Sequence, residues 1–192
     1  MIKATSRDKQ LVTDLLVKSF EDNQSVNYII HQDKNRLKRI HALMAYSFEI
    51  CQMSGEVVLS DDNRACALIL YPHKKRTSFK SIYLDIKLVL QSIGLPGLLK
   101  VLKREALIKK KQPKEEMAYL WFIGVDPLYQ QSGVGSWLLQ QVFVEAGKKK
   151  LPVYLETSTL RNLPWYKRFG FQIYDELNLG YTLYFLKRLP SN

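Results

Sequence analysis

Hydrophobic residues in the first third of the chain recur every three or four positions, the spacing that places side chains on one face of an α-helix. This pattern predicts an amphipathic helix near residues 7–20 and a second one near residues 35–53. Two β-rich segments follow, Glu56–Ser60 and Ala65–Tyr71, and the residues Asp61-Asp62-Asn63 between them are typical of a turn. The first part of the chain is therefore predicted to form two helices followed by a β-hairpin.

Residues 79–111 predict two more helices, separated at 94–97 because the glycines and the proline of that segment interrupt helical structure. Both helices are apolar over a broad face, which is formed by Ile82, Ile86, Val89, Leu90, Ile93, Leu98, Leu99 and Leu102. Exposed apolar surface is unfavourable in water, so we expect this face to pack against the rest of the protein.

The second half of the chain alternates between strand and helix patterns. Its first strand, Ala118–Val125, is an almost continuous apolar run, as expected for a central strand covered on both faces. The later elements are a helix that ends near Ala146, a strand over Pro152–Thr157, a short helix over Asn162–Arg168, and strands over Phe171–Leu177 and Tyr181–Lys187. This order predicts a mixed α/β sheet in a single domain, residues 1–192, with no linker.

Composition narrows the class of protein. Of the 192 residues, 46% are hydrophobic, which is too many for a disordered chain. The longest apolar stretch, near Met117–Val125, is shorter than the roughly 18–20 residues that a membrane-crossing helix needs. The N-terminus is positively charged but lacks the apolar segment of a signal peptide. We therefore expect a cytoplasmic protein with no membrane partner.

The two cysteines and three histidines do not have the spacing of metal ligands, so no structural metal is expected. The formal net charge is +11, and its lysine-rich clusters are dispersed along the chain. Such clusters either form a solvated basic surface or attract an anionic cofactor. No nucleic-acid reading motif accompanies them, so a nucleic-acid partner is not expected.

The residues Val125–Ser136 carry the first candidate chemistry. A buried strand ends at Asp126-Pro127, and a loop containing Gly133 and Gly135 then enters a helix. Backbone N–H groups at a helix start are unsatisfied and partly positive, and glycine lets a phosphate approach them closely. The segment lacks the Lys-Ser/Thr pair of a P-loop and the third glycine of a dinucleotide fingerprint, so taken alone it is either a phosphate site or a structural turn.

A second stretch lies between residues 154 and 171. A strand there ends at Glu156, and Asn162 and Tyr166 follow with the spacing that places both on one face of a short helix. A Gly170-Phe171 pair closes this helix. Each of these residues can also be purely structural, with Tyr166 packed in the core and Glu156 hydrogen-bonded to a helix start.

Together the two stretches resemble the GNAT family of N-acetyltransferases. The phosphate loop of that family reads Gln/Arg-x-x-Gly-x-Gly/Ala, which matches Gln130, Gly133 and Gly135, and a later Asn, Tyr and Gly-Phe match Asn162, Tyr166 and Gly170-Phe171. A narrower similarity to the puromycin N-acetyltransferase branch rests on the residues Leu155–Ser158, Arg161–Pro164 and Tyr166. The chain departs from many members by carrying Gln131-Ser132 where they have Gly-Lys or Gly-Arg.

The resemblance implies a mostly antiparallel sheet with flanking helices and one splayed parallel strand pair, here Ala118–Val125 and Val153–Thr157, with acetyl-CoA as co-substrate between them and no metal. Backbone groups near Ile123–Val125 would bind the pantetheine, and Asn162 would hydrogen-bond to it. The N–H groups of Gln131–Ser136 would hold the pyrophosphate. The implied cofactor-binding residues are Ile123, Gly124, Val125, Gln130, Gln131, Ser132, Gly133, Val134, Gly135, Ser136, Asn162 and Tyr166.

Two residues are candidates for proton transfer. Tyr166 is the candidate general acid for the departing CoA thiolate, because a tyrosine hydroxyl with a reference pKa near 10 is protonated at pH 7. Glu156 is the candidate base for the acceptor amine, acting directly or through water, and His31 and His41 are weaker alternatives. The alternative structural interpretations of Tyr166 and Glu156 stay open at this point.

The acceptor pocket is expected between the N-terminal helices and the helical segment at 79–111, with Phe20, Tyr28, Tyr46 and Tyr83 as lining candidates. The basic surface argues against polycationic acceptors such as polyamines and favours a small amine. The predicted protein is an N-acetyltransferase that acts as a monomer or homodimer. The alternatives are a protein N-terminal or lysine acetyltransferase, a non-catalytic CoA-binding sensor, and a nucleic-acid-binding protein.

Overall fold

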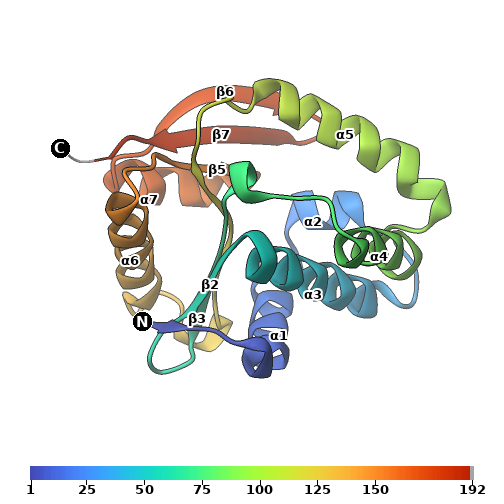
Figure 1. The fold of residues 1–192 in the computed structure, drawn as a ribbon, viewed down its shortest axis with the longest axis horizontal. Coiled ribbons are helices and arrows are strands. Elements are labelled where there is room, and N and C mark those ends of the chain that lie inside the picture. Colours follow the sequence, from blue (N-terminus) through green and yellow to red (C-terminus); the bar gives the residue numbers. More distant parts are fainter. Residues whose placement is uncertain (191–192) are drawn as a thin grey trace.

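The computed structural model describes residues 1–190, and its strands form one sheet with the order β1-β2-β3-β4-β5-β7-β6 (Figure 1). All neighbouring strands are antiparallel except β4 and β5, which are parallel. The strands are β1 (Ile2–Lys3), β2 (Gly55–Leu59), β3 (Ala65–Leu70), β4 (Ala118–Val125), β5 (Val153–Thr157), β6 (Gln172–Asn178) and β7 (Thr182–Arg188). The mixed α/β, mostly antiparallel sheet predicted for the chain is confirmed.

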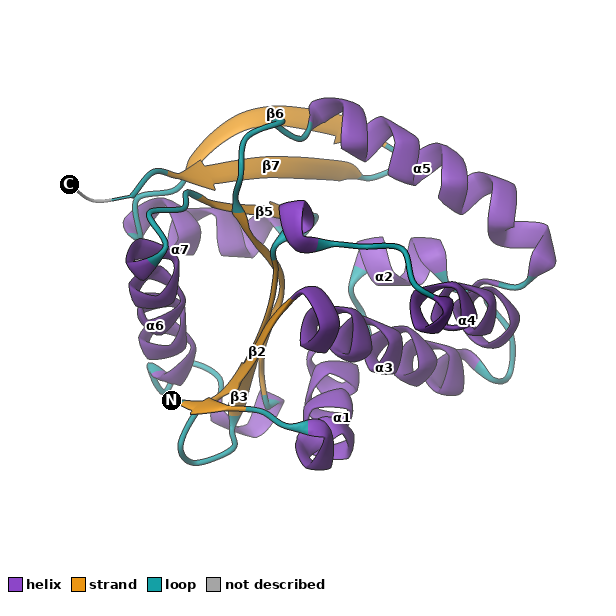
Figure 2. Ribbon diagram, viewed as in Figure 1, coloured by secondary structure: helices purple, strands orange, loops and turns teal. Residues whose placement is uncertain are grey.

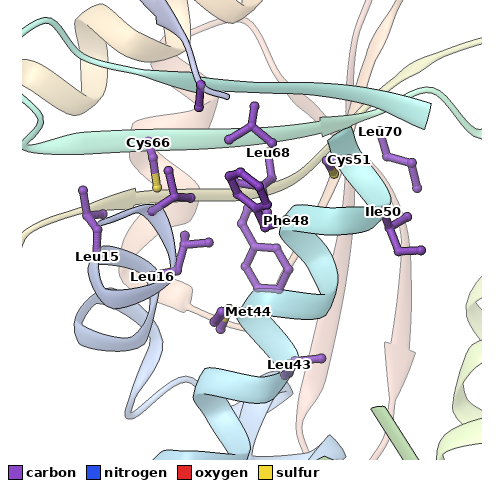
Figure 3. Close-up of a cluster of buried hydrophobic side chains, with 14 of the residues drawn as sticks. Leu15, Leu16, Leu43, Met44, Phe48, Ile50, Cys51, Cys66, Leu68 and Leu70 are labelled. Atoms are coloured by element: carbon purple, nitrogen blue, oxygen red, sulfur yellow. The ribbon is translucent and has the colours of Figure 1, made fainter. Parts of the chain in front are cut away.

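Helices cover both faces of the sheet (Figure 2). One face is covered by α1 and α3 and the other by α6 and α7, and each interface buries an apolar cluster. Phe48 of α3 lies at the centre of the first cluster, beside Leu16 of α1 and Leu68 of β3 (Figure 3). The helices are α1 (Lys9–Phe20), α2 (Gln24–Ile29), α3 (Arg36–Ser54), α4 (Phe79–Leu88), α5 (Leu98–Lys111), α6 (Val134–Lys148) and α7 (Leu163–Arg168).

The predicted helices near 7–20 and 35–53 are confirmed as α1 and α3, and the hairpin as β2 and β3. Two short elements, β1 and α2, were not predicted. The first has only two residues, Ile2–Lys3, and exists because β2 offers it a pairing edge. The second has six residues, too few for a periodic pattern, and begins at Asn23, whose side chain accepts a hydrogen bond from the Val26 N–H at 3.1 Å.

The parallel strands β4 and β5 separate soon after they meet. They pair only at Ala118 with Val153 and at Tyr119 with Tyr154, although β4 continues to Val125 and β5 to Thr157. The splayed pair that the resemblance implies is therefore present. Separated strands leave backbone N–H and C=O groups without a sheet partner on that side, so the gap is a place where an extended ligand can hydrogen-bond to β4.

An irregularity in β4 lies beside this gap. Leu120 pairs with Ile69 and Phe122 pairs with Leu68, so Trp121 has no partner of its own on β3. One extra residue in a strand is a β-bulge, which bends the strand and reverses the alternation of its side chains. As a result Tyr119, Trp121 and Phe122 all pack toward the cluster that α1 and α3 cover. The continuous apolar run of β4 contained no sign of this bulge.

The segment 79–111 forms α4, a π-helical turn at Val89–Ile93, a 3-10 turn at Leu95–Gly97, and α5. Its inward positions are buried, for example Leu84 of α4 and Val101 of α5. The expectation that its whole apolar face would be covered is wrong. Five of the positions predicted to pack are exposed to solvent: Ile82, Ile86, Leu90, Leu99 and Leu102. Each helix carries two apolar stripes, and the protein covers only one of them.

Candidate active site

The loop after β4 is held in a fixed conformation by local interactions. The Asp126 carboxylate accepts a hydrogen bond from the Leu128 N–H at 3.0 Å and forms an ion pair with Lys18 at 3.1 Å. Gln131 and Gly133 adopt positive φ angles of 64° and 88°, and Gly133 is the N-cap of α6. Glycine adopts a positive φ without the strain that most other residues incur, which explains why glycine stands at the helix start.

This conformation gathers the backbone N–H groups of residues 131–136. No described residue accepts a hydrogen bond from any of them, and the first intrahelical bond begins at Trp137, which donates to the Gly133 carbonyl at 3.0 Å. We call these six N–H groups of residues 131–136 the cradle. A Cβ on Gly133 would meet no atom within 4 Å, so the cradle is open at that position. A Cβ on Gly135 would lie 3.0 Å from Val125. Six unsatisfied N–H groups at the positive end of a helix fit an anion such as a pyrophosphate.

The short helix α7 is tied to this cradle. The indole nitrogen of Trp165 donates a hydrogen bond to the Ser136 hydroxyl at 3.0 Å, which joins α7 to the first turn of α6. Next along α7, Tyr166 is buried, and its ring packs edge-on against Phe171 with centroids 5.5 Å apart. The structure thus brings the two stretches singled out in the sequence together on one face of the sheet, and it places both Gly133 and Tyr166 there.

The Tyr166 hydroxyl is held in its protonated form. Burial raises its pKa, and no described residue forms a hydrogen bond with it. The side chain of Asn162, which precedes α7, also has no hydrogen-bond partner among the described residues. Both side chains are therefore available to a ligand. The packing of the Tyr166 ring is fully compatible with a role for its hydroxyl, so the two interpretations of this residue are not exclusive.

Glu156 lies on β5, and burial raises the pKa of its carboxyl group. The Gln112 side-chain amide donates a hydrogen bond to Oε1 at 2.9 Å, and the Tyr119 hydroxyl donates to Oε2. Both partners are side chains, so the alternative in which Glu156 hydrogen-bonds to a helix start is wrong. A raised pKa makes this carboxylate a stronger base than an exposed glutamate. Of the weaker candidates, His31 is exposed and lies beside Asp33, and His41 is half-buried and lies beside Asp14.

A buried cation lies close to Glu156 and was not singled out from the sequence. Arg104 of α5 donates hydrogen bonds to Ser25 at 2.6 Å and Tyr181 at 3.3 Å, and it pairs with Glu105. Its charge lowers the pKa of Glu156 and partly offsets the effect of burial. Arg104 occupies the inward stripe of α5 together with Val101 and Ile108, a spacing that could have identified it.

The predicted acceptor-lining residues are not all brought together. Phe20 packs edge-on against Phe122 at 5.1 Å, and Tyr46 packs against Trp121 at 6.3 Å, so both lie along the bulged part of β4. Tyr28 packs instead against Tyr181, at 5.4 Å. The prediction for Tyr83 is wrong, because its side chain is 61% exposed on the outer side of α4.

A pocket of about 580 Å³ lies between α3 and α4, and neither Tyr166 nor Glu156 lines it. This pocket lies where the acceptor pocket is expected, and Tyr46 is among its lining residues. Within the described residues, no group of three or more His, Cys, Asp or Glu side chains has an arrangement that could hold a metal ion.

Comparison with known proteins agrees with the resemblance to the GNAT acetyltransferases. Residues 101–173 match the family model of the acetyltransferase (GNAT) domain. An uncharacterized N-acetyltransferase from Schizosaccharomyces pombe is 36% identical over 61 residues, which span 32% of this chain and a quarter (25%) of that protein.

Two solved structures share the fold over almost the whole chain. A histone acetyltransferase and related acetyltransferase from Corynebacterium glutamicum has a TM-score of 0.71 and 19% identity, with 100% of this chain and 96% of that chain covered. Arylalkylamine N-acetyltransferase 2 from Aedes aegypti has a TM-score of 0.64 and 14% identity, with 99% and 98% covered. The fold is that of the GNAT acetyltransferases, and the matched domain contains the whole loop, Glu156 and α7.

Proposed function

We propose that this protein is an N-acetyltransferase that transfers an acetyl group from acetyl-CoA directly to the amine of a small molecule. One observation carries the proposal. The gap between β4 and β5 opens beside a cradle of six unsatisfied N–H groups, and α7, which bears Tyr166, is fastened to that cradle through Trp165 and Ser136. The match of residues 101–173 to the acetyltransferase domain supports this interpretation.

The residues present suit acetyl-CoA. The N–H groups of Gln131–Ser136 would bind its pyrophosphate. The edge of β4 at Ile123–Val125, which β5 does not pair with, would bind its pantetheine, and Asn162 would donate a hydrogen bond to the same arm. Gln130 is exposed just before the cradle, and its side-chain amide would contact the bound pyrophosphate. When bound, acetyl-CoA supplies the activated acetyl thioester.

Two side chains then handle protons. Glu156 accepts a proton from the acceptor amine, directly or through a water molecule, and its raised pKa strengthens it for this task. As the amine nitrogen bonds to the acetyl carbon, the carbon–sulfur bond breaks and the electron pair stays on sulfur. The Tyr166 hydroxyl, whose raised pKa keeps it protonated, donates its proton to that sulfur. One proton is taken up and one is released, so the step is balanced.

We propose a partly aromatic amine as the acceptor class. Aromatic rings from α1, α3 and β4 (Phe20, Tyr46, Trp121 and Phe122) line the side of β4 that faces α1 and α3, and they would stack on an aromatic amine. The net charge of +11 and the buried Arg104 disfavour polyamines and other polycations. The resemblance to the puromycin branch and the fold shared with an arylalkylamine N-acetyltransferase agree with this class.

The test is release of free CoA thiol from acetyl-CoA in the presence of aromatic amines, puromycin, polyamines, aminoglycosides and short lysine peptides. We expect release with aromatic amines. Tyr166→Phe should lower kcat by about 10²–10⁴-fold, the usual contribution of a general acid, with little change in acetyl-CoA affinity. Tyr184→Phe is the matched control, because Tyr184 is half-buried on β7 and its hydroxyl also has no partner among the described residues.

Other outcomes would replace the proposal. Release only with lysine peptides would indicate a protein acetyltransferase. Stabilisation of the protein by acetyl-CoA without release from any amine would indicate a CoA-binding sensor. Full activity of Tyr166→Phe would leave the acetyltransferase assignment standing but remove Tyr166 as the acid.

A further inference from the structure

The outer side of the segment 79–102 exposes an unusual amount of apolar surface. Its side chains range from 46% exposed at Ile82 to 94% exposed at Phe79. Almost half of the large apolar side chains exposed in the described part of the chain fall within this one segment. We call this surface the apolar ridge, and its residues are Phe79, Ile82, Tyr83, Ile86, Leu90, Leu95, Leu99 and Leu102.

The ridge residues are spaced so that they lie together on one side of each helix, so their exposure is not scattered. The α4 positions recur at intervals of three and four residues, so they share one side of the helix, and the buried Leu84 lies on the opposite side. On α5, Leu99 and Leu102 point away from the stripe that Val101 and Ile108 bury. Figure 1 shows α4 and α5 meeting at one end of the molecule, where they form its outer edge. Both helices therefore carry one apolar stripe that faces the core and a second one that faces solvent.

The two helices do not form one straight span. No single helix in residues 1–190 is long and apolar enough to cross a membrane. The pair Phe79–Ile93 and Leu95–Lys111 has the required length and composition together, but a bend of 102° separates its halves. Gly94, with a φ of +75°, and Pro96 occupy the bend. In this conformation the ridge can lie on an apolar phase but cannot cross it.

The charge around the ridge is positive. Residues 79–111 contain eight lysine or arginine residues and two acidic residues. The two acidic residues are already engaged, Asp85 by the Tyr46 hydroxyl and Glu105 by Arg104. Lys87 and Lys103 are exposed and have no partner among the described residues. An apolar stripe bordered by free lysines is complementary to a surface that is apolar inside and anionic outside.

We propose that the apolar ridge docks this protein on the surface of an anionic lipid bilayer. The ridge side chains enter the boundary between headgroups and acyl chains, and the lysines contact the anionic headgroups. A second copy of the chain fits less well, because a two-fold contact would place the ridge of one protomer, with its lysines, against the same lysines of the other. This proposal replaces the expectation, drawn from the short apolar stretches and the N-terminal pattern, that the protein has no membrane partner.

The experiment is co-sedimentation of the full chain with phosphatidylcholine vesicles that contain or lack phosphatidylserine. We expect binding to the phosphatidylserine vesicles only, and loss of binding near 1 M salt, where the screening length is about 3 Å. Leu99→Gln/Leu102→Gln should reduce partitioning at least about tenfold, because it removes apolar contact between the ridge and the acyl chains of the bilayer. The matched control is Leu37→Gln/Val144→Gln, two residues that are each 50% exposed outside the ridge.

Lys87→Gln/Lys103→Gln should also weaken binding, whereas Lys34→Gln/Lys38→Gln, two exposed lysines of the 31–38 region, should not. A Phe79→Trp variant reports insertion when the emission of the wild-type chain, which has three tryptophans, is subtracted, and the difference emission should shift to the blue when phosphatidylserine vesicles are added. Three results would overturn the proposal. They are no partitioning to anionic vesicles, equal partitioning of the ridge and control variants, or a concentration-dependent dimer that the ridge variant abolishes.

Discussion

Gly133 offers a quantitative test of the cradle, because the cost of adding a Cβ there is conformational and not steric. The residue has a φ of +88°, and the added Cβ would meet no atom within 4 Å. An L-residue in a left-handed conformation costs about 1–2 kcal/mol, so Gly133→Ala should carry that strain whenever the loop is native. Gly147→Ala, in the same helix, also places its Cβ in open space but without positive φ, and it should stabilise the protein by about 0.5–1 kcal/mol.

The strain at Gly133 can appear in two measurements. If the mutated loop keeps its conformation, the free energy of unfolding falls, and if the loop relaxes, acetyl-CoA binding must restore it and the affinity falls. The two losses should therefore sum to about 1–2 kcal/mol, which is a factor of about 5–30 in Kd if binding carries all of it. Urea denaturation and calorimetric titration with acetyl-CoA measure the two parts. A sum near zero, or an equal loss of affinity in Gly147→Ala, would refute the assignment of the cradle.

Further predictions concern the charge of the loop, the base and the cysteines. Gly133→Asp should bind acetyl-CoA more weakly than Gly133→Asn, because the two side chains have the same size and both tolerate positive φ, but only Asp adds a negative charge to the cradle; equal Kd values would contradict a pyrophosphate site. The acid limb of kcat/KM should titrate above 4.5, the ordinary pKa of a glutamate, because burial raises the pKa of Glu156, and a limb that persists in Glu156→Gln would exclude this residue as the base. The folded protein also holds the Glu156 proton to higher pH than the unfolded chain does, so wild-type stability relative to Glu156→Gln should decrease as pH rises past 4.5 in urea titrations. Cys51 and Cys66 should react with a disulfide reagent only after unfolding, because burial raises the pKa of both thiols; rapid labelling of the native protein would contradict their burial.

The features that the sequence predicted well are governed by local interactions. The apolar spacing in α1 and α3 reflects the geometry of a helix, whatever lies next to it. The same holds for the loop that enters α6. A strand that ends at Asp126-Pro127 and a glycine at the position that needs positive φ are properties of a few neighbouring residues. The conformation of this loop could therefore be predicted without any knowledge of the sheet.

Other features depend on partners that are distant in the sequence. The bulge at Trp121 exists because of the register that β3 imposes on β4. The raised pKa of Glu156 depends on burial, and its hydrogen bonds come from Gln112 and Tyr119, which lie 44 and 37 residues away along the chain. No pattern within β5 could indicate those neighbours. For Arg104 the spacing with Val101 and Ile108 indicates an inward position, but it does not reveal the partners Ser25 and Tyr181, which are distant along the chain.

The segment 79–111 contains both kinds of feature, those that follow from the sequence and those that follow from the tertiary structure. The sequence by itself determined that both helices are amphipathic and that glycine and proline separate them, because those properties follow from side-chain spacing and backbone restrictions. It did not determine which apolar stripe is covered, since burial depends on the space that α3 and the sheet leave free. The tertiary structure covers Leu84 and Val101 and exposes Phe79 and Leu99. Only the packed fold could separate a core-facing stripe from one that faces outward, because hydrophobicity alone does not specify a partner.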